Sequence, residues 1–155
     1  MNRKVYESVL TATPEEVWGF HASVEALPLL SPPGTEVTIL SEDTRVVEGA
    51  LHQLRVVRFG FMALRWDARI TDVEPPYRFV DTAERSPFKF WRHEHAFLPL
   101  PEGTMLRDTI EYELPFGPLG KIMDRLLVSH QESAPDTGIN RMLPYATLVS
   151  YGTGR

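Results

Sequence analysis

The sequence contains no cysteine, which excludes disulfide bonds and any metal site or catalytic mechanism that needs a thiolate. It has no basic excess either, since 16 Lys and Arg residues are outnumbered by 21 Asp and Glu residues and the formal net charge is −5. Nucleic-acid-binding domains normally carry a basic patch or stripe, so we expect no nucleic-acid partner. Gly152-Thr153-Gly154 lies in the C-terminal tail and not between a strand and a helix, so no phosphate-binding loop and no cofactor are predicted.

Long hydrophobic runs are missing as well. No run of about 18 apolar residues could span a membrane, and the opening MNRKVYESVLTATPEE has no apolar stretch long enough for a signal peptide. We therefore expect a soluble cytoplasmic protein without integral membrane association. The length of 155 residues, with 43% hydrophobic and 24% charged residues, is typical of one globular domain. We predict this domain over residues 1–150, with a frayed tail at 151–155.

The most regular pattern lies between Pro87 and Pro115, where two alternating runs are joined by the Pro- and Gly-containing segment 99–103. A period of two predicts half-buried antiparallel strands, and the short link predicts a hairpin loop. One face of this hairpin is mainly apolar and yet carries two histidines and an aspartate. Its members are Trp91, His93, His95 and Phe97 on the first strand and Leu106, Asp108, Ile110, Tyr112 and Leu114 on the second. If the loop closes near Gly103, Asp108 lies opposite His95.

The remaining sequence predicts a strand, two short helices, more strands and a helical C-terminal region. Thr13 is a good N-cap for a helix over Pro14–His21, and a second short helix is expected over 23–27, ended by Pro28. Strands are expected over 3–10, 36–40, 49–59, 61–73 and 77–84, ahead of the hairpin. Residues 119–146 have a period near 3.6, which predicts an amphipathic helix with a break near 133–137 at Pro135.

Successive strands with short links form an antiparallel meander, whose apolar face needs a cover. The C-terminal helix is the only predicted element long enough to provide one. The sequence therefore predicts an α+β fold, in which a curled antiparallel sheet of six to seven strands wraps around a long C-terminal helix, with two short helices after the first strand. The opposite, charged face of the sheet is expected to be solvated and to carry cross-strand ion pairs.

Several motifs follow one another along nearly the whole chain. They are Pro14-Glu15-Glu16-Val17-Trp18; Trp66; Pro75-Pro76-Tyr77-Arg78-Phe79-Val80-Asp81; Phe88 and Trp91; His93-Glu94-His95-Ala96-Phe97; Gly103-Thr104; Leu106-Arg107-Asp108; Tyr112-Glu113-Leu114-Pro115; and Gly117-Pro118-Leu119-Gly120. With them the chain resembles the START-like, or helix-grip, superfamily (SRPBCC), and within it the bacterial polyketide cyclase/dehydrase-like branch. The resemblance implies a hydrophobic small molecule, such as a lipid, sterol, quinone or polyketide, held between sheet and helix. It also implies that a minority of members catalyse cyclisation or dehydration.

The inward face is the predicted ligand-binding site, because large aromatic side chains on a curled sheet can line a pocket for a flat apolar ligand as well as fill a core. The predicted ligand-binding residues are Met62, Trp66, Phe79, Trp91, His93, His95, Phe97, Asp108, Ile110, Tyr112, Met123 and Leu127. On this basis we expect a carrier or sensor of a hydrophobic small molecule. An interaction module with a vestigial pocket is an alternative, and it predicts a large exposed apolar patch.

The histidines and the aspartate on this face can have one of three roles. They can form a structural hydrogen-bond network, orient the polar end of a ligand, or act as acid–base groups of a cyclase or dehydratase, in which His93 or His95 is the base and Asp108 supports it. Two histidines and one carboxylate can in principle bind a metal. No metal site is predicted, however, because His-x-His on a strand without a further ligand is a weak signal.

Overall fold

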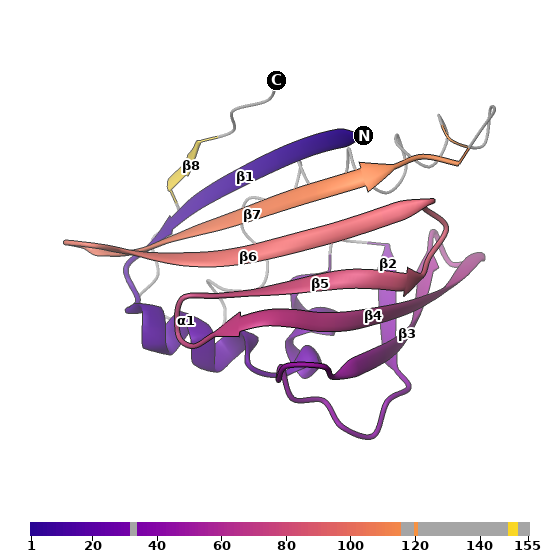
Figure 1. The fold of residues 1–155 in the computed structure, drawn as a ribbon, viewed down its shortest axis with the longest axis horizontal. Coiled ribbons are helices and arrows are strands. Elements are labelled where there is room, and N and C mark those ends of the chain that lie inside the picture. The colour runs from indigo at the N-terminus through magenta and orange to yellow at the C-terminus, as the bar shows by residue number, and fades with distance from the viewer. Residues whose placement is uncertain (32–33, 116–119, 121–148, 152–155) are drawn as a thin grey trace.

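The computed structural model describes residues 1–31, 34–115, 120 and 149–151. In this part the chain forms one curled antiparallel sheet, with α1 (Pro14–His21) packed beneath one end of it (Figure 1). The order of strands is β2-β3-β4-β5-β6-β7-β1-β8. The strands from β2 to β7 therefore pair with their neighbours in sequence, which confirms the predicted meander, and β1 returns to pair with β7.

Seven long strands confirm the predicted sheet of six to seven. They are β1 (Asn2–Leu10), β2 (Thr35–Ile39), β3 (Leu51–Arg58), β4 (Met62–Glu74), β5 (Arg78–Arg85), β6 (Phe90–Leu100) and β7 (Gly103–Glu113). A short strand, β8 (Val149–Tyr151), extends the sheet beyond β1. Tyr151, which the sequence analysis assigned to the tail, is paired there with Glu7.

The first helix begins as predicted. The backbone N–H of Glu16 donates to the Thr13 hydroxyl at 3.3 Å, and the Glu16 carboxylate accepts from the Thr13 N–H at 2.8 Å, which completes a capping box. The second helix is a correction. A 3-10 turn, η1 (Val24–Ala26), runs directly into α2 (Leu27–Leu30), so Pro28 does not end a helix. Pro28 lies in the first turn of α2, where the missing N–H has no partner to lose.

The predicted C-terminal helix, with its break near 133–137 and its ligand-facing Met123 and Leu127, lies outside the described residues. Among the helices that are described, none is long and apolar enough to cross a membrane.

The inner face of the sheet carries two groups of buried apolar side chains. The first lies under α1 and includes Leu10, Val17, Val24, Ile70, Phe79, Phe97 and Leu106. Trp18 from α1 meets Phe79 and Phe97 edge-on, with ring centroids 5.9 and 6.1 Å away, so it holds the helix against the sheet. The second group lies toward the other end and contains Phe88, Trp91, Ile110 and Tyr112, with Trp66 packed against it. Complete burial of one such side chain stabilises the fold by roughly 1.5–3 kcal/mol.

The outer face of the same strands carries ion pairs, as predicted. Arg92 on β6 lies 3.4 Å from Glu111 on β7, and Arg107 on β7 pairs with Glu7 on β1 at 2.6 Å. Pairs of this kind join neighbouring strands side by side. The alternation of the sequence therefore separates an aromatic inner face from a charged outer face.

The loop between β6 and β7 closes at Gly103, which sets the register of the central hairpin. Gly103 has a φ of +149°, and a Cβ there would overlap the backbone carbonyl oxygen of Leu10, so only glycine fits. The buried Thr104 hydroxyl donates to the carbonyl oxygen of Ala12 at 2.7 Å and ties the loop to the end of β1. With this closure His95 lies opposite Asp108, which confirms the predicted register.

Candidate functional site

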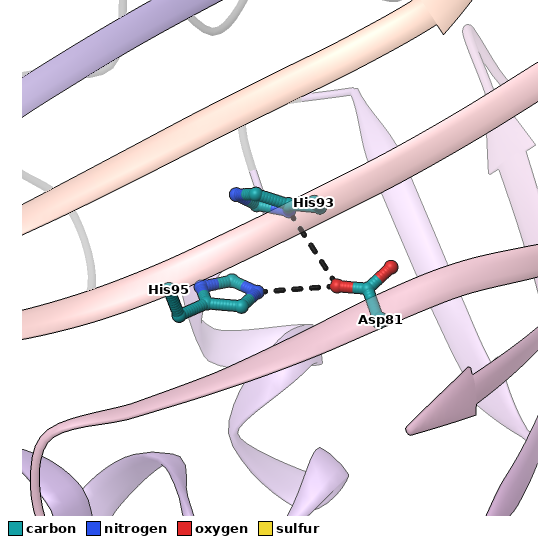
Figure 2. Close-up of side chains that lie close together, drawn as sticks. All are labelled: Asp81, His93 and His95. Atoms are coloured by element: carbon teal, nitrogen blue, oxygen red, sulfur yellow. Dashed lines mark hydrogen bonds and ion pairs between the residues drawn. The ribbon is translucent and has the colours of Figure 1, made fainter. Parts of the chain in front are cut away.

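Four ionisable side chains from three adjacent strands meet on the inner face of the sheet. His93 and His95 project from β6, Asp108 from β7 and Asp81 from β5. The registers place Asp81 opposite His93 and Asp108 opposite His95, so each histidine has a carboxylate on the strand beside it. Figure 2 shows both imidazole rings beside the carboxylate of Asp81. We call these four residues the His/Asp cluster.

The imidazole of His95 bridges the two carboxylates. Its Nδ1 lies 2.8 Å from Oδ1 of Asp108, and its Nε2 lies 3.2 Å from Oδ2 of Asp81. A carboxylate can only accept a hydrogen bond, so an imidazole with both partners in place carries protons on both nitrogens.

The imidazole of His93 lies against that of His95, with ring centroids 3.9 Å apart. Its Nε2–H donates to the same Oδ1 of Asp108, at 3.1 Å. Its Nδ1 lies 3.7 Å from Oδ2 of Asp81, which is beyond hydrogen-bond distance. When His93 is neutral, the lone pair on Nδ1 therefore points toward Asp81 without being engaged by it.

The electrostatics of the cluster follow from this geometry. Burial alone would lower the pKa of His95, but hydrogen bonds and charge interactions with Asp108 and Asp81 outweigh it and raise this pKa to about 9. Burial would likewise raise the pKa of Asp108, but the hydrogen bonds from His93 and His95 hold it well below its usual range. At neutral pH His95 is therefore an imidazolium ion and Asp108 a carboxylate.

The cluster lies between the two apolar groups and stays partly accessible. Phe79 stacks on His95 with centroids 4.4 Å apart, and Trp91 meets His93 edge-on at 6.3 Å. The four polar side chains keep 14–25% of their surface exposed. Charged groups are therefore held on an otherwise aromatic face without being sealed inside it.

Two further histidines lie in the protein interior. His21, at the end of α1, is only 8% exposed, and its Nδ1–H donates to the carbonyl oxygen of Val17 at 2.8 Å. Burial lowers the pKa of His21 to about 4, and its ring centroid lies 6.3 Å from that of His95. His52 on β3 is 1% exposed, and burial lowers its pKa as well. Both are neutral at neutral pH, in contrast to His95.

The structure places the predicted ligand-binding residues in three groups. The His/Asp cluster brings together the three predicted acid–base residues His93, His95 and Asp108. Met62 and Trp66 on β4 are partly buried, whereas Phe79, Trp91, Phe97, Ile110 and Tyr112 are buried within the apolar groups. The predictions for Met123 and Leu127 lie outside the described residues.

Sequence reasoning did not assign Asp81 or His21 to the site. The signal for Asp81 was its alternation with Phe79, which puts both on one face of a strand. That pattern gives the face of β5 but not the residue of β6 beside it. The spacing of His21 and Val17, four apart on one helix, would place His21 on the buried face of α1. Nothing in the sequence points from there to His95.

Comparisons with known proteins agree with this fold. The profile of the family described as polyketide cyclase / dehydrase and lipid transport matches residues 10–134. A crystal structure from Chromobacterium violaceum has a TM-score of 0.65 at 21% identity, covering 86% of this chain and 96% of that one. One from Thermus thermophilus has a TM-score of 0.62 at 24% identity, covering 86% and 88%. An aromatase/cyclase from Streptomyces has a TM-score of 0.60 at 18% identity, covering 86% and 88%. No functionally curated protein matches the sequence.

Proposed function

The chain belongs to the polyketide cyclase/dehydrase and lipid transport family, and we propose that it binds a hydrophobic small molecule against the inner face of its sheet, as a carrier or sensor. The observation that carries this proposal is the position of the His/Asp cluster. Four ionisable groups lie between two groups of buried apolar side chains and remain 14–25% exposed. An apolar surface with a few convergent polar groups is typical of a small-molecule site.

A purely structural role accounts less well for the cluster. Moving charged groups out of water costs free energy, and replacing a buried ion pair by apolar residues of similar size is often neutral or stabilising. Phe79 and Trp91 beside the cluster show that this face accommodates large apolar side chains. Stability alone therefore does not require Asp81, His93, His95 and Asp108 at these positions.

The charge of the cluster indicates which kind of polar group on a ligand it can bind. Asp81 and Asp108 contribute two negative charges, and the imidazolium of His95 balances one of them when His93 is neutral. All the hydrogens on His95 nitrogens already face carboxylates. A ligand carboxylate or phosphate would be repelled, whereas a hydroxyl group can donate to a carboxylate oxygen. The proposal is thus a neutral, hydroxyl-bearing hydrophobic ligand, in the range of lipids, quinols and polyketide-like aromatics.

A matched pair of probes tests this specificity. Hexadecanol and palmitate share an alkyl chain of the same length and differ in the polar end. We expect each, when it binds, to displace the uncharged fluorescent apolar dye Nile red, with hexadecanol at least about tenfold stronger, which corresponds to about 1.4 kcal/mol. Equal displacement or a preference for palmitate would contradict the charge argument. No saturable Nile red binding would contradict the ligand site itself and favour the interaction-module alternative.

Two neighbouring residues of β6 provide the mutational control. His95→Ala removes the bridging imidazole from the inner face, whereas Glu94→Ala removes a charged side chain from the outer face of the same strand. The preference for hexadecanol should change in His95→Ala and persist in Glu94→Ala. Native mass spectrometry of the wild-type protein from its own host would then identify a co-purified ligand by mass.

For the enzyme alternative, a cyclase or dehydratase, the geometry favours His93 over His95 as the general base. Both nitrogens of His95 face carboxylates, and its pKa is raised to about 9, so it cannot accept a proton at neutral pH. In its neutral form with Nε2–H on Asp108, His93 would present the lone pair of Nδ1, which is the arrangement of an oriented general base. A cyclase or dehydratase would therefore lose its turnover of a polyketide-type substrate in His93→Gln. A ligand carrier would bind without converting the ligand, as mass spectrometry of the released molecule would reveal.

A further inference from the structure

We propose that Asp81, His93 and His95 form a binding site for a divalent first-row transition-metal ion, with Asp108 orienting both imidazoles. The sequence pattern showed only two histidines on a strand and lacked a further ligand. Asp81 supplies that ligand from the neighbouring strand β5. The inference does not depend on an organic ligand, because the three donor atoms belong to the protein.

The donor atoms converge on one point beside the inner face. One donor atom from each of Asp81, His93 and His95 lies within 4.8 Å of the other two, and Figure 2 shows the two imidazoles on the same side of the carboxylate. The carboxylate oxygen is 3.2 Å from Nε2 of His95 and 3.7 Å from Nδ1 of His93. Ligands about 2.0–2.1 Å from a tetrahedral ion lie roughly 3.3 Å from one another. The two distances to the carboxylate oxygen are thus within about 0.5 Å of the spacing that coordination requires, and side-chain rotations would complete the approach.

Asp108 provides an independent argument. Metal-bound histidines usually donate their other N–H to a carboxylate or carbonyl group, which fixes the tautomer and the ring orientation. Here the two nitrogens that face away from Asp81 are Nε2 of His93 and Nδ1 of His95. Both contact the same Oδ1 of Asp108, at 3.1 and 2.8 Å. The nitrogens left for a metal are therefore those that face Asp81.

The donor set selects the class of ion. Two imidazoles and one carboxylate suit Zn²⁺, Fe²⁺ and Co²⁺, whereas Mg²⁺ and Ca²⁺ prefer oxygen ligands. Three protein ligands leave at least one coordination position open, as in metal sites that also bind a small molecule. The residual exposure of the three side chains, between 14 and 17%, gives an ion access to this position.

A proton competes with the metal for His95. The metal takes the place of the proton between Nε2 of His95 and Oδ2 of Asp81, so the ion must form bonds to all three ligands to displace it. Without metal, both nitrogens of His95 are hydrogen-bonded to carboxylates. An ion that displaces the proton on Nε2 can occupy the same position.

The test uses Co²⁺ as a spectroscopic probe on the untagged, EDTA-treated protein of residues 1–155. We expect one equivalent of Co²⁺ to bind with absorption bands in the visible region typical of nitrogen and oxygen ligands, and Zn²⁺ to displace it while Mg²⁺ does not. Binding without saturation near one equivalent, or no visible bands, would overturn the proposal. Because no organic ligand is added, this outcome leaves the proposed hydrophobic ligand site unaffected.

Matched variants assign the ligands. Asp81→Asn should weaken Co²⁺ binding at least about 100-fold, and Asp108→Asn should weaken it about 10- to 100-fold, as is usual for partners of metal-bound histidines. Asp43→Asn makes the same change at an exposed aspartate that pairs only with Arg45 among the described residues, and it should leave binding unchanged. Equal effects at Asp43 and Asp81 would contradict the assignment. Circular dichroism and thermal unfolding verify the fold of each variant.

A measurement on the wild-type protein keeps the proposal falsifiable if the variants do not fold. In nitrogen-detected NMR of the imidazoles, Zn²⁺ should shift the ring nitrogens of His93 and His95. The resonances of the interior His21 and His52, which are outside the proposed ligand set, should change far less. Shifts at other histidines only, or none at one equivalent of Zn²⁺, would refute the site.

Discussion

The two faces of the central strands carry two charged networks that differ in kind. On the outer face Arg92 pairs with Glu94 and Glu111, at 3.1 and 3.4 Å. On the inner face His95 pairs with Asp81 and Asp108 at 3.2 and 2.8 Å. The distances between charged atoms are similar in the two networks, and one strand, β6, contributes to both.

The chemistry of the positive partner separates the two. Arginine stays charged at every pH that a protein survives. The Arg92 and Glu111 side chains keep 28% and 33% of their surface exposed, and an arginine–carboxylate pair at the protein surface contributes only about 0–1 kcal/mol. Histidine exchanges its proton near neutral pH and offers a lone pair when neutral. The outer network is thus suited to solubility and sheet pairing, whereas the inner one is suited to binding a ligand or an ion. Three experiments test this difference, and each is done in EDTA to exclude metal.

The largest effect is expected from removing one carboxylate from each face of β7. Asp108→Asn leaves the imidazolium of His95 without its shortest partner. It should lower the free energy of unfolding by about 2–3 kcal/mol, somewhat less than the 3–5 kcal/mol typical of fully buried pairs. Glu111→Gln on the outer face should cost less than about 1 kcal/mol. Urea unfolding of both variants measures the contrast, and equal losses would show that the two networks are equivalent.

The second effect concerns pH. The folded-state pKa of His95, about 9, lies above its ordinary value of 6.5. Its contribution to stability is therefore complete below pH 6.5 and is lost as the pH rises through 9. A shift of this size sets an upper limit of about 3 kcal/mol, which the residual exposure of the His95 side chain reduces to about 1–2 kcal/mol. Urea unfolding between about pH 6.5 and 9.5 should reveal this slope in the wild type and a much flatter profile in His95→Gln, because that variant lacks the imidazole whose proton is lost. A wild-type profile as flat as that of the variant would disprove the role of His95.

The smallest effect is expected from salt. Raising NaCl from about 0.05 to about 0.5 M shortens the Debye length and screens exposed charges more than partly buried ones. The small penalty of Glu111→Gln should vanish at high salt, a change below about 0.5 kcal/mol. The penalty of Asp108→Asn should persist. Loss of both penalties at high salt would place the inner network in a solvent-like environment.

Several local features were predictable because they depend on neighbouring residues in sequence. Thr13, Pro14 and Glu16 specify the start of α1 through backbone hydrogen bonds within four residues. Gly103 specifies the closure of the β6–β7 loop, and the register of His95 and Asp108 follows by counting. Pro28 was misread as a stop, because proline is excluded from the interior of a helix but accepted in its first turn.

Only the part of the site that lies on the β6–β7 hairpin was predictable from the sequence. His93, His95 and Asp108 belong to consecutive strands joined by a short loop. Asp81 belongs to β5, and the link from β5 to β6 does not indicate which of its residues lies beside His93. A shift of one residue in that register would turn Asp81 to the other face.

The amino-acid sequence by itself determined the meander of strands, the separation of an aromatic face from a charged face, and the pairing of His95 with Asp108. These features depend on alternation and on turns, which act over a few residues. Only the tertiary structure decided that Asp81 completes the cluster and that His95 is a cation while His21 is neutral. A pKa depends on burial and on charges brought together from distant parts of the chain, and no local pattern contains those distances.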